Sequence, residues 1–446
     1  MRHLFRALGA AGAGLLGTAS LVVATASATE APQYYVYCHR VGAYELRACD
    51  GQPRVPATPA GRQLRWVLGL LADGGPNLTV EQVREHVDPV LLAFFPAEQI
   101  VATFQATYAE LGPGRFRGFD HPARERQAVA LVDTPHLRAA AAVGVDPTSG
   151  LIDELAVTEA PPMIVPHGAH SGWYDVGGRR LFLRCTGTGS PTVVFENGLT
   201  IDWFALQNRL SATTRTCSYD PALQDGSFSR SDPAPTPRTG IDRVRDLHRL
   251  LSAARIRGPI VLAGHSNGGL FSLLYAARHP GQVAGLVLID GVHPAYHRRE
   301  VAMLRHHLPP EVWAEFVAHA CDIPPAVVDP ERLDICDAER QTHAALRAHP
   351  LPPMPLAVIT HGVVAPGTYT DGWPVEPSER LWSRLQDELA GLEPGSRHVI
   401  AVRSDHDIQH EQPGLVLRQV TAVVSAVRHG RTWLDRPAEQ AGGEPR

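Results

Sequence analysis

The sequence predicts an α/β protein in which a mostly parallel sheet follows a smaller α+β domain. From residue 172 onward, apolar strand signals alternate with amphipathic helix signals, a pattern typical of parallel strands joined by crossover helices. Ahead of that point the helix signals come first and the strand signals follow them. A chain of 446 residues is long enough to fold into two domains.

Residues 1–28 have the pattern of a secretory signal peptide. Two arginines give a positive start, residues 7–23 form a weakly apolar run, and residues 26–28 read A-S-A, a small-residue cleavage site. The alternative is an uncleaved membrane anchor, which the short and weakly apolar run disfavours. We therefore expect a secreted, extracytoplasmic protein that is cleaved after Ala28 and has no stable membrane insertion.

Composition argues against some classes of partner. The formal net charge is −5 and no basic run stands out, so nucleic acid is not an expected partner. Histidine and cysteine residues are scattered without the spacing of metal ligands, so we expect neither a metal nor another cofactor. The lack of lysine, with heavy use of alanine, glycine and proline, is typical of a GC-rich bacterial coding sequence.

The six cysteines form an even set, which favours disulfides in an oxidising compartment. Pairing of sequence neighbours would join Cys38 to Cys49, Cys185 to Cys217, and Cys321 to Cys336. Buried free thiols are the alternative, and the sequence alone leaves the connectivity open.

Residues 30–160 predict the small α+β domain. Helix signals come first, at residues 62–72, 80–86 and 97–111. Strand signals separated by turn residues follow, at residues 116–119, 126–132, 137–145 and 151–157. This order resembles the NTF2-like or cystatin-like domains that precede catalytic domains in some secreted bacterial hydrolases, and residues 137–155 carry the resemblance. No catalytic constellation is visible here, so we expect a structural or binding role.

A linker at residues 161–171 leads to the second domain, at residues 172–432. Between residues 295 and 350 the chain has helical periodicity and is long for a simple connection, so we expect a helical cap there. Residues 433–446 are polar and rich in glycine and proline, which is typical of a disordered tail.

The strongest motif is G-H-S-N-G at residues 264–268, which matches the pattern G-x-S-x-G. It follows an apolar strand signal at 260–264 and precedes a helix signal at 270–278. A sharp turn from strand to helix holds the central residue in a strained conformation and raises it above the sheet edge. A chance match in a loop is the alternative, but this context predicts that Ser266 is a nucleophile.

With this motif, residues 172–430 resemble the α/β-hydrolase superfamily. The resemblance is carried by L-R-C-T-G at 183–187, V-V-F-E-N-G at 193–198, L-I-D-G-V-H-P at 288–294 and the region around His406. It implies an eight-stranded, mostly parallel sheet, and an esterase-like serine hydrolase that acts on a small-molecule acyl substrate such as a carboxylic ester. It also implies that Cys185 and Cys217 lie on adjacent strands, where a bridge is possible.

A serine hydroxyl is a weak nucleophile and needs a base. In this fold the order along the chain is serine, acid, histidine, so the base should follow the last strand. His406 lies at that place and is the predicted base. His410, four residues further on, is the weaker candidate.

Two aspartates compete for the role of the acid that orients His406. The usual place is the loop after the seventh strand, but residues 361–364 there hold no carboxylate, and Asp371 comes about ten residues late. Asp290 ends the preceding strand, and we favour it as the acid. An aspartate at that position can also have a purely structural role, so the choice stays open.

An oxyanion hole needs two backbone N–H groups that face the developing negative charge. The resemblance implies the N–H groups of Asn267 and Leu199, with Asn197 where relatives usually carry a histidine. Two other functions remain open: a non-catalytic binding protein of the same fold, or an amidase, peptidase or perhydrolase that uses the same triad.

Overall fold

The computed structural model describes residues 54–434, except 120–122, 160–169, 199–202, 223–228, 325–328, 330, 366–367 and 370–371. The expected signal peptide, the Cys38–Cys49 pair, most of the linker and most of the polar tail lie outside the described residues. None of the helices in the described ranges combines the length and the apolar character that a membrane span requires.

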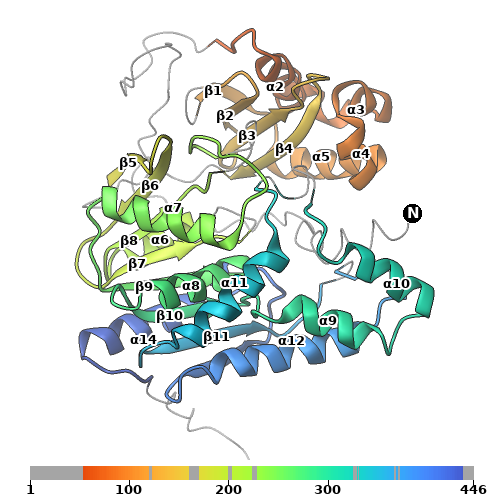
Figure 1. The fold of residues 1–446 in the computed structure, drawn as a ribbon. Helices are drawn as coiled ribbons and strands as arrows, with labels where there is room; N and C mark the ends of the chain where they lie inside the picture. The colour runs from red at the N-terminus through yellow and green to blue at the C-terminus, as the bar shows by residue number, and fades with distance from the viewer. Residues whose placement is uncertain are drawn as a thin grey trace, which may run out of the picture.

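The first unit packs helices against a four-stranded antiparallel sheet, ordered β1-β2-β3-β4 (Figure 1). Its elements are α2 (Pro59–Gly69), a π turn (Leu70–Gly74), a 3-10 turn (Gly75–Asn77), α3 (Val80–His86), α4 (Pro89–Phe94), α5 (Ala97–Leu111), β1 (Arg115–Phe119), β2 (Gln127–Asp133), β3 (Arg138–Val145) and β4 (Ile152–Glu159). The buried face of α2 contributes Leu64 and Val67 to an apolar cluster that also holds Ala128 and Ala130 of β2 and Ala141 of β3. The α+β prediction for this unit is confirmed.

The second unit is an eight-stranded sheet, ordered β12-β11-β10-β9-β7-β8-β6-β5. Its strands are β5 (His170–Asp175), β6 (Arg180–Thr186), β7 (Thr192–Glu196), β8 (Thr216–Tyr219), β9 (Ile260–His265), β10 (Val283–Ile289), β11 (Leu356–His361) and β12 (Arg397–Ala401). In the order of the sheet, neighbouring strands from β12 to β8, including β7, are paired in parallel. The pairings of β8 with β6 and of β6 with β5 are antiparallel. The predicted mostly parallel, eight-stranded sheet is therefore confirmed.

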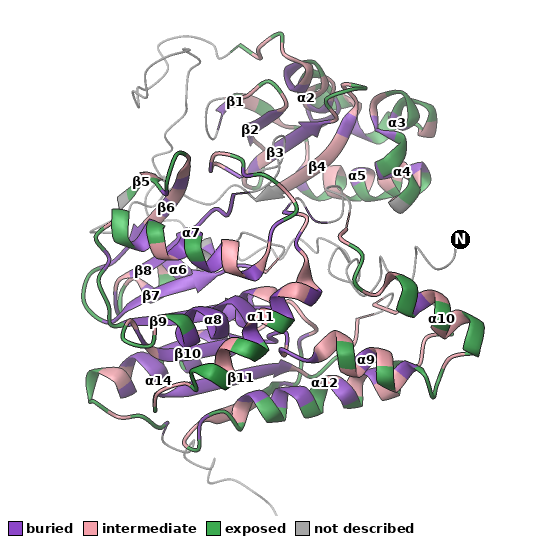
Figure 2. Ribbon diagram, viewed as in Figure 1, coloured by how far each residue is buried: buried purple, intermediate pink, exposed green. Residues whose placement is uncertain are grey.

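Helices cover both faces of this sheet, which is why its central strands are buried throughout (Figure 2). They are α6 (Phe204–Leu210), α7 (Gly240–Ala253), α8 (Asn267–Arg278), α9 (Tyr296–Leu304), α10 (Pro310–His319), α11 (Ile335–Ala348), α12 (Val375–Ala390), α13 (Ile408–Glu411) and α14 (Pro413–Arg428). One apolar cluster joins α7 and α8 to the sheet, and a second joins α6 and α14 to the opposite face. The segment expected to form a cap contains α9, α10 and α11. Because α11 packs against α7 and α8, only α9 and α10 remain candidates for a cap.

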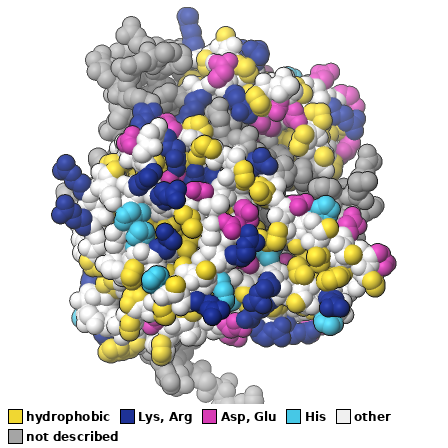
Figure 3. All heavy atoms as spheres, viewed as in Figure 1, with side chains coloured by type: hydrophobic (Ala, Val, Ile, Leu, Met, Phe, Trp, Pro, Cys, Tyr) yellow, Lys and Arg dark blue, Asp and Glu magenta, His cyan; other side chains and the backbone are white. Residues whose placement is uncertain are grey.

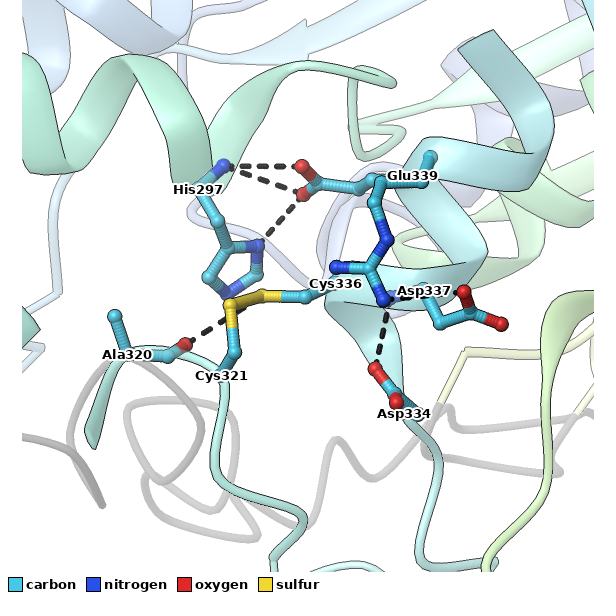
Figure 4. Close-up of a disulfide and its surroundings, with 8 residues drawn as sticks. His297, Ala320, Cys321, Asp334, Cys336, Asp337 and Glu339 are labelled. Atoms are coloured by element: carbon cyan, nitrogen blue, oxygen red, sulfur yellow. Dashed lines mark hydrogen bonds and ion pairs between the residues drawn. A yellow bond between two sulfur atoms is a disulfide. The ribbon is translucent and has the colours of Figure 1, made fainter. Parts of the chain in front are cut away.

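Two of the three expected disulfides fall within the described residues, and both are present. Cys185 and Cys217 are paired in register on the antiparallel strands β6 and β8. Cys321 and Cys336 join the segment after α10 to the first turn of α11 (Figure 4). The neighbouring-pair prediction is confirmed for these four residues.

The two units touch through main-chain acceptors. Arg124 of the first unit donates to the carbonyl oxygens of Arg230 and Ser231 (both 3.0 Å), and Gln127 donates to that of Ser229 (3.4 Å). On the face shown in Figure 3, acidic and basic side chains are interspersed rather than gathered by sign. That face offers no continuous basic surface.

Candidate active site

The predicted nucleophile, Ser266, lies at a sharp turn between β9 and α8. Its φ of 55° is in the left-handed region, where residues other than glycine are uncommon. A Cβ at Gly264 would lie 2.3 Å from the carbonyl oxygen of Gly268, so position 264 requires glycine. The backbone N–H of Ser266 donates to the carbonyl of Ile289 (3.1 Å). Close packing and this bond therefore hold the strained turn that the motif predicts.

His406 lies in the loop after β12 and binds the predicted acid. Its Nδ1 is 2.6 Å from Oδ2 of Asp290, which directly follows β10 and is fully buried. The carbonyl of His406 accepts a hydrogen bond from Nε2 of His265 (2.9 Å), and the two rings lie 4.6 Å apart. Since His265 precedes Ser266 in the chain, these contacts bring the base candidate beside the serine turn.

The second ring nitrogen of His406 is free for chemistry. Nε2 is buried and has no hydrogen-bond partner among the described residues. With Nδ1 donating to Asp290, Nε2 of a neutral imidazole carries the lone pair. A buried, unpaired acceptor of this kind is suited to taking a proton from a hydroxyl group.

The Asp290 carboxylate accepts four hydrogen bonds. Besides His406, the donors are Nδ1 of His361 (2.7 Å), the backbone N–H of His361 (3.1 Å) and Nε1 of Trp382 (2.9 Å). Burial alone would raise the pKa of Asp290, but the His361 charge and the hydrogen bonds from both histidines hold it well below its usual range. Asp290 is therefore an anion at neutral pH.

The structure brings together only some of the predicted residues. Asp290 and His406 are in direct contact, whereas His410 is exposed on α13. Asp371 and Leu199 lie outside the described residues. Asn267 is the first residue of α8, where its backbone N–H belongs to the free end of the helix.

The loop after β7 passes directly over the serine. A Cβ added at Gly198 would lie 2.9 Å from Cβ and 3.4 Å from Oγ of Ser266. The Asn197 side chain is turned the other way: its Nδ2 donates to the carbonyl of Tyr219 (3.0 Å), and its Oδ1 accepts from Nε1 of Trp203. Asn197 therefore shapes the loop, which explains how this residue can replace the usual histidine.

A buried set of ion pairs holds the loop after β7 in place. Arg243, fully buried on α7, donates to Glu196, to Glu331 (2.8 Å) and to the carbonyl of Asn197 (3.3 Å). We call the linked side chains the arginine network; they are Arg179, Arg238, Arg243, Glu196, Asp246 and Glu331. Burial raises the pKa of Glu196, and the Arg243 charge offsets part of that rise.

Sequence reasoning predicted His406 as a partner of Asp290 but missed His361 and Trp382, and it missed Glu379, which contacts His361. His361 is the last residue of β11, at the strand end where the resemblance would have placed a carboxylate nearby, and that position was a usable signal. Trp382 and Glu379 lie on α12 and carry no local pattern that marks them. In the described part of the chain, no group of three or more His, Cys, Asp or Glu side chains is arranged to hold a metal ion.

Comparison with known proteins agrees with this fold. Residues 191–321 match the family model described as alpha/beta hydrolase fold, and residues 55–145 match the one described as ORF 12 gene product N-terminal. The class that the topology and the first match define is the alpha/beta hydrolase fold, and the second unit of this chain has that fold. The NTF2-like or cystatin-like resemblance of the first unit stays a prediction.

Individual relatives are distant. A protein named probable transporter efuK, from Hormonema carpetanum, is 30% identical over 128 residues, which is 27% of this chain and 18% of that protein. The uncharacterized protein YqjL of Bacillus subtilis is 24% identical over 247 residues, which is 52% of this chain and 82% of that one. The match to the solved structure of a thermophilic esterase from Thermogutta terrifontis covers 58% of this chain and 99% of the esterase chain, at 22% identity and a TM-score of 0.37. The chain thus spans less than a fifth of the length of the first of these relatives.

Proposed function

We propose that this protein is an exported serine hydrolase that cleaves a carboxylic ester through an acyl-enzyme. The observation that carries the proposal is the pairing of His406 Nδ1 with the buried Asp290, which leaves Nε2 unpaired beside the strained serine turn. The hydrolase fold supports the reaction class. The two disulfides are compatible with export.

In the proposed reaction, Nε2 of His406 takes the hydroxyl proton as Oγ of Ser266 attacks the substrate carbonyl. The carbonyl π electrons move onto oxygen, where the N–H groups of Asn267 and Leu199 stabilise the charge. The tetrahedral intermediate collapses, the ester C–O bond breaks, and His406 returns its proton to the leaving alkoxide. Water then attacks the acyl-enzyme by the same route, which releases the acid and restores Ser266.

A fluorophosphonate probe tests the proposal without knowledge of the substrate. We expect the probe to label the wild-type chain and not Ser266→Ala. Ser272→Ala is the matched control, because Ser272 is a buried serine on α8, the helix that follows Ser266, and its hydroxyl donates to the carbonyl of Gly268 (2.7 Å). A folded wild-type chain that stays unlabelled would instead favour a non-catalytic binding protein of this fold.

The same machinery could serve amides, peptides or peroxide. A panel of p-nitrophenyl esters and matched anilides, with acyl chains of increasing length, separates these activities. We expect ester turnover to exceed amide turnover, and the preferred chain length then defines the acyl site. Amide turnover that exceeds ester turnover would reassign the substrate class and leave the triad in place.

A further inference from the structure

His361 lies between two carboxylates. Its Nδ1 is 2.7 Å from Oδ2 of Asp290, and its Nε2 is 2.8 Å from Oε2 of Glu379 on α12. A neutral imidazole has one N–H donor, so it can satisfy only one of two facing carboxylates. Two ionised carboxylates at these distances require both nitrogens to carry a hydrogen, which makes the ring a cation.

The other groups around His361 favour the same charge state. Tyr369 donates its hydroxyl to Oε1 of Glu379 (2.6 Å), so Oε2 is the oxygen that faces His361. The Trp382 ring is neutral, 6.1 Å from the His361 ring. On α9, Glu300 accepts a hydrogen bond from the hydroxyl of Tyr296 (2.7 Å), and burial raises the pKa of Glu300. Burial lowers the pKa of His361, but Asp290 and Glu379 together raise it to about 10.

We propose that His361 is a protonated positioning residue, which orients the Asp290 carboxylate toward His406 and sets the lower pH limit at which His406 can act as a base. The inference rests on the proposed function, because it concerns the same triad. His361 contacts no substrate in this role. It acts through Asp290, whose Oδ2 it shares with His406.

The physical reason is the sharing of one buried anion by two imidazoles. Asp290 is fully buried, and an isolated buried carboxylate would be costly without nearby positive charge. The positive charge on His361 meets that need and also disfavours a second positive charge on His406. The His361 charge therefore favours the neutral form of His406, which is the form that can act as a base. Glu379 opposes the effect, because its negative charge partly neutralises His361.

The test is the pH dependence of the fluorophosphonate labelling rate of Ser266 in the full chain. Labelling needs neutral His406, so the rate falls on the acidic side. His361→Gln removes a positive charge and should move the midpoint of that fall up by about one pH unit. Glu379→Gln removes a negative charge and should move it down. Opposite shifts in two neighbouring variants are not expected from a merely structural role.

His398→Gln is the matched control. His398, on the neighbouring strand β12, likewise has a partner at each ring nitrogen, but these are the Asp387 carboxylate (2.9 Å) and the Thr360 hydroxyl (2.7 Å) rather than Asp290. In His398→Gln, the pH midpoint of the fall in labelling rate should stay at the wild-type value. Unchanged midpoints in labelled, folded His361→Gln and Glu379→Gln chains would overturn the inference, as would shifts in the same direction.

A measurement on the wild-type chain does not depend on any variant. Nitrogen-15 chemical shifts of the histidine rings at pH 8 should show both nitrogens of His361 protonated, and a neutral His361 ring would overturn the inference. A folded wild-type chain without labelling would contradict the proposed function instead. In that case the ring shifts would still decide the charge of His361.

Discussion

Two charge networks, one buried and one partly buried, flank the serine turn, and they differ in how their charges balance. The arginine network lies under the loop after β7, and the histidine network lies at the ends of β10 and β11. We define the histidine network as Asp290, His361, Glu379 and His406. Both networks are built from side chains that are far apart in the sequence.

In the arginine network the charges cancel. Three arginines face three carboxylates, and the carboxylates of Glu196, Asp246 and Glu331 are each at most 7% exposed. Every acid has a guanidinium partner, so the charges balance before any reaction begins, although Nε of Arg179 and Nε of Arg243 have no hydrogen-bond partner among the described residues. Its function is to hold Glu196, and with it the loop of Asn197 and Gly198, in one place.

In the histidine network the charges do not cancel at rest. Asp290 and Glu379 carry two negative charges against one positive charge on His361, as long as His406 is neutral. The balance is reached only when His406 takes a proton. The charges of this site balance better after the proton transfer than before it. Such a site stabilises the transition state more than the ground state. The comparison therefore separates a network that maintains structure from one that is suited to catalysis.

The largest expected effect is that of Asp290→Asn. The amide cannot supply the anion that His406 needs, and it can favour the wrong ring tautomer. We expect the rate of fluorophosphonate labelling to fall by about 10,000-fold. Circular dichroism and thermal unfolding should confirm that the variant is folded. A loss of less than tenfold in folded protein would mean that another carboxylate, such as Asp371, orients His406.

Arg243→Met should affect stability more than any other change in the arginine network. It removes the guanidinium that pairs with the buried Glu196 and leaves Glu331 paired with Arg238, which should cost about 3–5 kcal/mol of the free energy of unfolding. Urea denaturation measures the loss. Arg84→Met is the control, because the Arg84–Glu98 pair (3.0 Å) is exposed and should contribute under about 1 kcal/mol. Equal losses in the two variants would refute a special role for the buried network.

Glu331→Gln should have an intermediate effect. Glu331 accepts from both Arg238 (2.9 Å) and Arg243 (2.8 Å), and the amide retains one acceptor oxygen. We expect a loss of about 1–3 kcal/mol in the same urea experiment, with the labelling rate of Ser266 changed less than in Asp290→Asn. A labelling rate as low as that of Asp290→Asn would show that the two networks are not separate in function.

The smallest expected effect is a pH-dependent difference in stability between wild type and His361→Gln. The pKa of His361 is raised from about 6.5 to about 10 on folding. Its contribution to the free energy of unfolding is therefore complete below pH 6.5 and is lost as the pH rises through 10. The difference between the two chains should shrink by at least about 1 kcal/mol across this interval, measured by urea denaturation. A constant difference would show that His361 does not gain a proton on folding.

Local patterns predicted much of the fold and the centre of the site. The turn at Ser266 is readable because the glycines, the apolar strand and the helix are contiguous in sequence. The position of His406 follows from the same logic, since it lies just after the last strand. The alternation of strands and helices likewise predicted the parallel sheet.

The choice of acid could not be made in this way. Asp290 is 116 residues from His406 and 71 from His361, so no local pattern records that the three meet. The register of β10 against β11, in which Ile289 pairs with Ile359, brings the strand ends together. The backbone N–H of Asp290 then donates to the carbonyl of Ile359 (2.7 Å) and holds the carboxylate at that edge.

The sequence by itself determined the order of the elements, the turn at Ser266 and the candidates for base and acid, because each depends on neighbours within a few residues. Only the tertiary structure paired Asp290 with His406, placed His361 and Glu379 behind them, and set Arg243 under the loop that crosses the serine. Those contacts depend on strand register and helix packing. Long-range packing of this kind brings distant charges together, and it leaves no periodic signature in the chain.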